Sequence, residues 1–245
     1  MQPFLAKDDP CSVGIMLTLD SPEVAELLSL CGFDWLLIDM EHTAISYGGV
    51  QRMIQAVGRR VPVLVRTTGH EASAITKALD VGSDGVVIPG VNTPEQARRV
   101  VGAAKYPPQG TRGFGLGRAQ GYGLEARAYA EAANRTASVI VMIEHQEAVR
   151  NVEAILDVAG IDGVLVGPYD LSGSFGTPGD TASDAVQAAI ATTKRACAER
   201  SIPFGTFVAE AEAAGAALDG CQFALLGSDA LVLGRAAREL AGRFG

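Results

Sequence analysis

The sequence predicts a single-domain α/β protein that folds as a (β/α)₈ TIM barrel over residues 1–245. The length is close to the roughly 250 residues typical of this fold. Short apolar, β-branched runs alternate eight times with stretches of helical spacing, which is typical of a parallel sheet. Eight such units in this length favour a closed barrel over an open, doubly wound sheet, and the sequence shows no linker to a second domain.

The expected strands are short runs rich in Val, Ile and Leu. They cover Ser12–Leu19, Asp34–Glu41, Pro62–Thr67, Gly85–Val91, Ser138–Glu144, Gly163–Asp170, Pro203–Val208 and Phe223–Ser228. The helical spacing covers Pro22–Cys31, Tyr47–Arg59, Glu71–Val81, Pro94–Lys105, Gln146–Val158, Ala182–Arg200, Glu210–Leu218 and Ala230–Phe244. One long connection, Pro107–Leu124, is rich in Gly and Arg, and we expect a loop over one end of the barrel.

Composition narrows the range of partners. The net charge of −8 argues against nucleic acid and against anionic membrane, because both need a basic face. No apolar run approaches the roughly 18 residues of a membrane helix, and the N-terminal residues lack the pattern of a secretory signal. The scattered cysteines predict free thiols in a reducing cytoplasm; they are Cys11, Cys31, Cys197 and Cys221.

Polar residues gather at the C-terminal ends of the expected strands, where barrels of this kind build their active sites. They are Asp39, Glu41, His42, Arg66, Glu144, His145, Asp170 and Asp229. Glu144 and Asp170 close successive strands, so we expect them side by side, and paired carboxylates suit a hard divalent cation. Each residue alone also fits a structural role, such as a helix cap or an ion pair, but no such cluster marks the opposite ends of the strands.

Other chemistries fit the sequence less well. A Schiff-base enzyme needs a strand-end lysine, and Lys7, Lys77, Lys105 and Lys194 all lie elsewhere. Three His and scattered Cys do not supply the spacing of a zinc site. The glycines of Gly113–Gly117 follow no expected strand and open no expected helix, so they do not predict a site for NAD or flavin.

Five segments, in order along the chain, carry a family resemblance. They are "GFDWLLIDMEH" (Gly32–His42), "VGSDGVVIPGV" (Val81–Val91), "YPPQGTRG" (Tyr106–Gly113), Ile143–Glu144 and "GVLVGPYDLS" (Gly163–Ser172). The chain resembles the metal-dependent (class II) pyruvate aldolases of the HpcH/HpaI aldolase family over nearly its whole length. This family is typified by 4-hydroxy-2-oxoheptanedioate aldolase and 2-dehydro-3-deoxyglucarate aldolase.

The resemblance implies an aldehyde-lyase that cleaves or forms 4-hydroxy-2-oxo acids from pyruvate or hydroxypyruvate and an aldehyde. It implies Mg²⁺ or Mn²⁺ held by Glu144 and Asp170, with Co²⁺ or Zn²⁺ as alternatives. Arg66 matches the arginine that faces the keto oxygen, and His42 matches the catalytic histidine, paired with Asp39. This set suits an enolate route, because a divalent cation and Arg66 would stabilise the developing oxyanion while His42 moves a proton.

Other positions complete the implied site. Asp80 matches an aspartate that reaches a neighbouring subunit's site, in a family that forms homo-hexamers. The substrate carboxylate would be held by backbone N–H groups of a turn formed by Gly167, Pro168, Tyr169 and Asp170. Met142, Phe207 and His145 depart from the residues common in relatives, and we expect Met142 and Phe207 to contact the substrate.

Two alternatives from other classes stay open at this point. One is a lyase that cleaves a CoA thioester of a hydroxy acid, of the citrate or malyl-CoA lyase type. It would need a nucleotide-binding extension for which 245 residues leave little room. The other is a non-catalytic barrel subunit, which would have no reason to keep Arg66, Glu144 and Asp170 at one rim.

Overall fold

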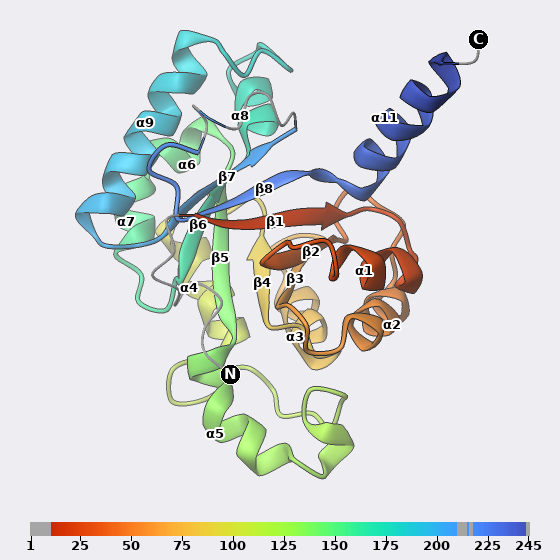
Figure 1. The fold of residues 1–245 in the computed structure, drawn as a ribbon. Helices are drawn as coiled ribbons and strands as arrows, with labels where there is room; N and C mark the ends of the chain where they lie inside the picture. The colour runs from red at the N-terminus through yellow and green to blue at the C-terminus, as the bar shows by residue number, and fades with distance from the viewer. Residues whose placement is uncertain (1–10, 210–214, 216–217, 244–245) are drawn as a thin grey trace.

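The computed structural model describes residues 11–209, 215 and 218–243. Within this part of the chain, eight parallel strands close into a barrel in sequence order, which confirms the predicted fold (Figure 1). The strands are β1 (Ser12–Leu17), β2 (Trp35–Asp39), β3 (Val63–Arg66), β4 (Gly85–Ile88), β5 (Ser138–Ile143), β6 (Gly163–Val166), β7 (Phe204–Val208) and β8 (Phe223–Ser228).

Helices lie outside the barrel (Figure 1), and several of them begin at a side-chain cap. They are α1 (Pro22–Leu28), α2 (Tyr47–Val57), α3 (Ala72–Asp80), α4 (Pro94–Ala104), the 3₁₀ turn η1 (Gly121–Gly123), α5 (Ala126–Thr136), α6 (Gln146–Arg150), α7 (Val152–Leu156), α8 (Pro168–Ser174), α9 (Asp184–Glu199) and α11 (Asp229–Gly242). Ser21, Ser46 and Ser228 each accept a hydrogen bond from a first-turn N–H group, and Thr93 with Gln96 forms a capping box.

The predicted strands agree with the structure except at their ends. The expected strand Gly163–Asp170 is too long: β6 ends at Val166, because Pro168 starts α8 and has no N–H group to donate to a neighbouring strand. The expected helix Gln146–Val158 is divided at Asn151 into α6 and α7. The expected helix Glu210–Leu218 lies largely outside the described residues, and α5 and α8 were not predicted.

Apolar side chains fill the barrel interior in layers, beginning at the N-terminal ends of the strands. Trp35 and Phe223 meet edge to face near the N-terminal ends of the strands, with ring centroids 6.1 Å apart. Gly14 and Gly205 make room for them, since a Cβ at either position would come within 2.4 Å of a ring atom. Leu37 belongs to the same inner cluster, further along β2. A larger apolar layer lies between the strands and the helices.

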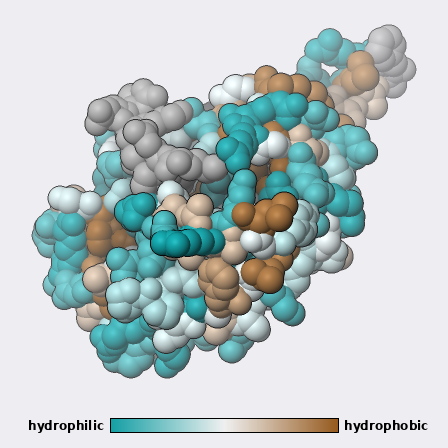
Figure 2. All heavy atoms as spheres, turned by 90° about the horizontal axis from the view of Figure 1, so that it is seen from below, coloured by the Kyte–Doolittle hydropathy of each residue, from teal (hydrophilic) through white to brown (hydrophobic). Residues whose placement is uncertain are grey.

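Helix α11 extends away from the barrel instead of packing along it (Figure 1). Its residues from Ala230 to Arg243 are exposed, including the apolar residues Leu231, Val232, Leu233 and Leu240. The connection between α4 and α5 exposes a second apolar group, made up of Phe114, Leu116, Tyr122 and Leu124. Figure 2 shows apolar side chains both on the projecting arm and among polar residues on the face seen from below. None of the described helices combines the length and apolarity needed to cross a membrane.

The layered interior predicts that Gly205 tolerates no side chain. We expect Gly205→Ala to lower the free energy of unfolding by about 1–3 kcal/mol, because the new methyl group must displace the Phe223 ring. Urea unfolding of both proteins measures the difference. Gly113→Ala is the matched control, since a Cβ there meets no atom within 4 Å. If Gly205→Ala were as stable as Gly113→Ala, the barrel interior would accommodate the added methyl group without loss of stability.

Candidate functional site

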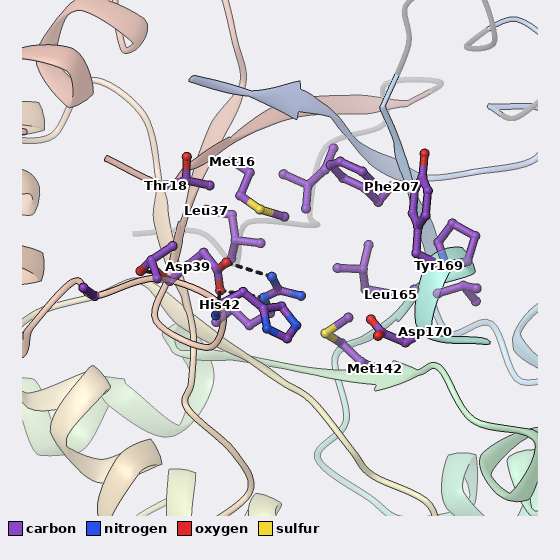
Figure 3. Close-up of a pocket in the computed structure, with 17 residues that line it drawn as sticks. Met16, Thr18, Leu37, Asp39, His42, Met142, Leu165, Tyr169, Asp170 and Phe207 are labelled. Carbon is purple, nitrogen blue, oxygen red and sulfur yellow. Dashed lines mark hydrogen bonds and ion pairs between the residues drawn. The ribbon is translucent and has the colours of Figure 1, made fainter. Parts of the chain in front are cut away.

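A pocket of about 440 Å³ opens at the C-terminal ends of the strands. Its lining includes nine residues that the sequence predicts for the site: Asp39, His42, Arg66, Met142, Gly167, Pro168, Tyr169, Asp170 and Phe207. Figure 3 shows Asp39 and His42 toward one end of the pocket and Tyr169 and Phe207 at the other. Four of these residues, Asp39, His42, Arg66 and Asp170, come from the strand-end pattern of the sequence, and the other five come from the family resemblance.

Arg66 and Asp39 form a buried ion pair across neighbouring strands. The register of β2 and β3 sets the two residues directly beside each other, and both follow the inward alternation of Leu37 and Leu64. Arg66 Nε donates to Asp39 Oδ1 and Nη2 donates to Oδ2, each at 2.8 Å. This two-point pairing of a planar guanidinium with a carboxylate fixes the Arg66 side chain within the pocket wall.

The same pair keeps Arg66 charged. Burial lowers the pKa of Arg66, but the hydrogen bonds and charge of Asp39 and the charge of Glu41 outweigh it and raise the pKa overall. Asp39 also accepts the backbone N–H of Glu41 at 2.9 Å. The Asp39 carboxylate is thus directed at Arg66, and it meets His42 through the backbone N–H of that residue at 3.4 Å.

Glu41 adds a carboxylate to which the sequence assigns no role. Its Oε2 atom lies 3.3 Å from Arg66 Nη1 and 3.8 Å from His42 Nε2. The same atom is buried and has no hydrogen-bond partner among the described residues. Burial raises the pKa of Glu41, partly offset by the charge of Arg66. Its spacing of two from Asp39 is the signal that identifies it, because alternate residues of an extended segment share a face.

His42 lies at the mouth of the pocket, with a side chain that is 61% exposed. Its imidazole points into the pocket (Figure 3). The exposed ring is accessible to solvent, and Glu41 is the carboxylate beside it.

Glu144 follows β5 and lies beneath the first turn of α8. Its Oε1 atom accepts the backbone N–H of Gly90 at 2.7 Å, while its buried Oε2 atom has no hydrogen-bond partner among the described residues. Burial raises the pKa of Glu144 to about 7, and the negative charges of Glu41 and Asp170 add to this effect. A Cβ at position 167 would lie 3.1 Å from Oε2, so glycine there keeps the space beside this atom open.

The donor set at this rim fits a hard divalent cation. Glu144 offers a buried oxygen with no partner, and Asp170 lies close enough for its charge to act on Glu144. In the described part of the chain no group of three or more His, Cys, Asp or Glu side chains is arranged to hold a metal ion. The ion would therefore rest on two carboxylates and take its other ligands from substrate and water, an all-oxygen set that suits Mg²⁺ or Mn²⁺.

The first turn of α8 offers fewer N–H groups than the sequence predicts. The N–H of Gly167 donates to the carbonyl of Ile143 at 3.4 Å, and Pro168 has none. The N–H groups of Tyr169 and Asp170 lie in the first helical turn, where no intrahelical acceptor exists. These two groups are the ones available to an anion in the pocket.

Two other candidates lie outside the pocket. Asp80 ends α3, on the far side of the barrel wall, where its Oδ1 atom accepts from Arg112 Nη2 at 2.7 Å and from Gln120 Nε2 at 3.1 Å. The Nδ1 atom of His145 accepts the backbone N–H of Glu147 at 3.1 Å and caps α6. Asp80 thus belongs to a polar cluster under the long connection, and His145 has a structural role.

Comparison with known proteins decides the family. The family model described as HpcH/HpaI aldolase/citrate lyase matches residues 12–236. The chain belongs to this family. A hydroxypyruvate/pyruvate aldolase from Cupriavidus necator is 39% identical over 95% of this chain and 87% of its own length. A 4-hydroxy-2-oxo-heptane-1,7-dioate aldolase from Shigella sonnei is 40% identical over 95% of this chain and 90% of its own.

The solved structures agree with this placement in the HpcH/HpaI aldolase/citrate lyase family. A family member from Burkholderia cenocepacia superposes with a TM-score of 0.92 at 31% identity, covering 97% of this chain and 96% of its own. The fold of this chain is therefore one already known in the family.

The raised pKa of Glu144 predicts a pH-dependent stability in the metal-free protein. Between its usual value of 4.5 and about 7, folded Glu144 holds a proton that the unfolded chain has lost. The free energy of unfolding should therefore fall as the pH rises through this window, by at most about 3 kcal/mol.

Urea unfolding with chelator present, at about pH 5 and about pH 8, measures this change. Glu144→Gln should remove most of the fall, because the amide cannot ionise. Glu131→Gln, an exposed carboxylate of α5, is the control and should retain it. A fall of the same size in the parent and in Glu144→Gln would assign the effect to another group.

Proposed function

We propose that this protein is a metal-dependent aldolase that reversibly cleaves 4-hydroxy-2-oxo acids into pyruvate or hydroxypyruvate and an aldehyde. The observation that carries the proposal is the buried, partnerless Oε2 atom of Glu144, close to Asp170 and within the field of Arg66. The aldolases that resemble the chain are named for hydroxypyruvate and pyruvate and for 4-hydroxy-2-oxo-heptane-1,7-dioate. Their names and this donor set support the same reaction.

Glu144 and Asp170 would hold the divalent cation, Mg²⁺ or Mn²⁺, with Co²⁺ or Zn²⁺ as alternatives. When bound, the cation supplies a Lewis acid that polarises the keto oxygen of the 2-oxo acid. The N–H groups of Tyr169 and Asp170 would bind the carboxylate of the same molecule, because the start of a helix favours an anion.

Arg66 supplies a fixed positive charge where negative charge develops. Asp39 and Glu41 hold the guanidinium before any substrate arrives, so little reorganisation is needed during the reaction. We assign Arg66 to the keto oxygen, which gains charge as a proton leaves the adjacent carbon. Asp39 acts as a positioning residue for Arg66.

His42 moves the proton in this proposal. Its ring faces the pocket (Figure 3), so it can carry a proton between the carbon next to the keto group and the oxygen of the aldehyde. Glu41, 3.8 Å away, stabilises the imidazolium that forms. A positioned acid–base group of this kind contributes about 10²–10⁴ in rate.

We also propose that the protein acts as a homo-oligomer in the cytoplasm, with a hexamer as the implied state. The exposed apolar residues of α11 support a contact with a second copy, since large exposed patches mark interaction surfaces. Asp80 would reach the site of a neighbouring subunit in such an assembly. Four free cysteines suit a reducing compartment.

Activity should depend on a divalent cation. We expect release of pyruvate from a 4-hydroxy-2-oxo acid to be lost with excess chelator and restored by Mg²⁺ or Mn²⁺, because Arg66 alone leaves the surrounding carboxylates unneutralised. Borohydride with pyruvate should trap no adduct, and a hydroxyacyl-CoA ester should not be cleaved. Full activity in chelator, or a trapped lysine adduct, would overturn the metal-dependent mechanism.

Removing the imidazole should separate catalysis from binding. His42→Ala should lower kcat for aldol cleavage by about 10²–10⁴ while leaving the affinities for metal and pyruvate close to those of the parent. Calorimetry measures the affinities beside the kinetics. His70→Ala removes an imidazole that does not line the pocket and is the control. Loss of metal affinity in His42→Ala would make this residue a ligand instead.

A further inference from the structure

The pocket has a charged side and an apolar side. Arg66, Asp39 and Asp170 belong to the charged side, together with Glu144 beneath it. The remaining wall is built from large apolar side chains of five strands: Met16, Met142, Leu165, Phe207 and Leu225. Figure 3 shows Met16, Leu165 and Phe207 across the pocket from Asp39 and His42. A substrate with its 2-oxo acid on the charged side would direct its other end at this wall.

The rim above that wall is aromatic. The Tyr169 and Phe207 rings meet edge to face, with centroids 6.2 Å apart. Phe207 also packs against the apolar cluster that fills the barrel interior. Wall and rim therefore form one continuous apolar surface, which favours a ligand that buries hydrocarbon.

Among the described residues, this surface offers no free cationic side chain to an anionic ligand. Arg66 is the only lysine or arginine among the described residues that line the pocket, and the proposed function assigns it to the keto oxygen of the 2-oxo acid. Four carboxylates, Asp39, Glu41, Glu144 and Asp170, lie around the one guanidinium, so the pocket has a surplus of acidic groups. A divalent cation would offset part of this surplus, and the carboxylate of a 2-oxo acid would add one negative charge. Another anion would enter a negative field with no partner.

From this geometry we infer that the acceptor of the proposed aldolase is an uncharged aldehyde with an apolar chain, and that acid-terminated aldehydes are disfavoured. The inference rests on the proposed function. In the bond-forming direction, the carbon next to the keto group loses a proton and bonds to the aldehyde carbon, and the aldehyde oxygen gains a proton. No oxidant or further reactant is needed. Phe207 is the specificity-determining residue, because it joins the wall to the rim.

A pair of aldehydes of matched shape tests the inference. Succinic semialdehyde ends in a carboxylate, and 4-methylpentanal ends in an isopropyl group of similar outline. With pyruvate and Mg²⁺, we expect kcat/KM to be at least about tenfold higher for 4-methylpentanal. An equal or higher value for succinic semialdehyde would overturn the inference. If neither aldehyde reacts and no 4-hydroxy-2-oxo acid is cleaved, the proposed function fails instead.

Binding without reaction provides a second readout. In saturation-transfer NMR, 4-methylpentan-1-ol should bind the protein measurably and 4-hydroxybutanoate should not. Tighter binding of 4-hydroxybutanoate would contradict the inference even if turnover were slow for both aldehydes. Because neither alcohol can undergo the aldol reaction, this result does not depend on catalysis.

Variants at one position should move the preference in opposite ways. Phe207→Leu should lower kcat/KM for 4-methylpentanal by about tenfold and leave the KM for pyruvate unchanged, because it removes apolar wall only. Phe207→Lys should shift the ratio toward succinic semialdehyde by about tenfold or more. Leu30→Lys adds the same charge at an exposed position outside the pocket lining and should leave the ratio unchanged. An unchanged ratio in both Phe207 variants would place the acceptor elsewhere.

Discussion

The buried pairing of Arg66 with Asp39 is the interaction on which the site depends. Burying a charge is costly unless it is paired and hydrogen bonded, and the register of β2 and β3 supplies the partner on the adjacent strand. Glu41 Oε2 lies 3.3 Å from Arg66 Nη1, and the charge of Arg66 also acts on Glu144, where it lowers the pKa. One guanidinium thus stands among four carboxylates and cannot neutralise them.

That imbalance explains the condition of Glu144. Its partnerless Oε2 atom and its raised pKa have one physical cause, a buried carboxylate in a site with surplus negative charge. Either a proton or a cation can neutralise the Glu144 carboxylate. In the metal-free protein near neutral pH the carboxylate binds a proton, and in the proposed mechanism a divalent cation replaces that proton. In this account, stability and function compete at the same oxygen atom.

The barrel determines where the pocket can exist and what it accepts. Trp35 and Phe223 close the interior at one end because Gly14 and Gly205 give their rings space. The next layer is still apolar, so the pocket has a hydrocarbon wall directly beside its charged rim. The same strands therefore supply both the polar groups that bind a 2-oxo acid and the surface that meets the other reactant.

Much of this could be predicted from the sequence, because strand alternation places every second residue inward and puts strand-end residues on one rim. Arg66, Asp39 and Glu144 follow from that rule, whereas Asp170 lies in the first turn of α8, beyond the end of β6. The pairing of Asp39 with Arg66 does not follow from it, since register is a property of two strands and neither strand alone shows it. The sequence does not predict α8, because its seven residues follow an apolar strand almost directly and Pro168 is equally compatible with a turn.

The most direct test of this account is calorimetric titration of Mn²⁺ into the metal-free protein in two buffers of different ionisation enthalpy. If Glu144 is protonated until a cation replaces the proton, binding should release about one proton per ion near pH 6 and almost none near pH 8.5. Glu144→Gln should show no such release at either pH. Tight binding of Mn²⁺ near pH 6 without proton release, or no binding at all, would contradict the claim that a buried carboxylate and a cation define this site.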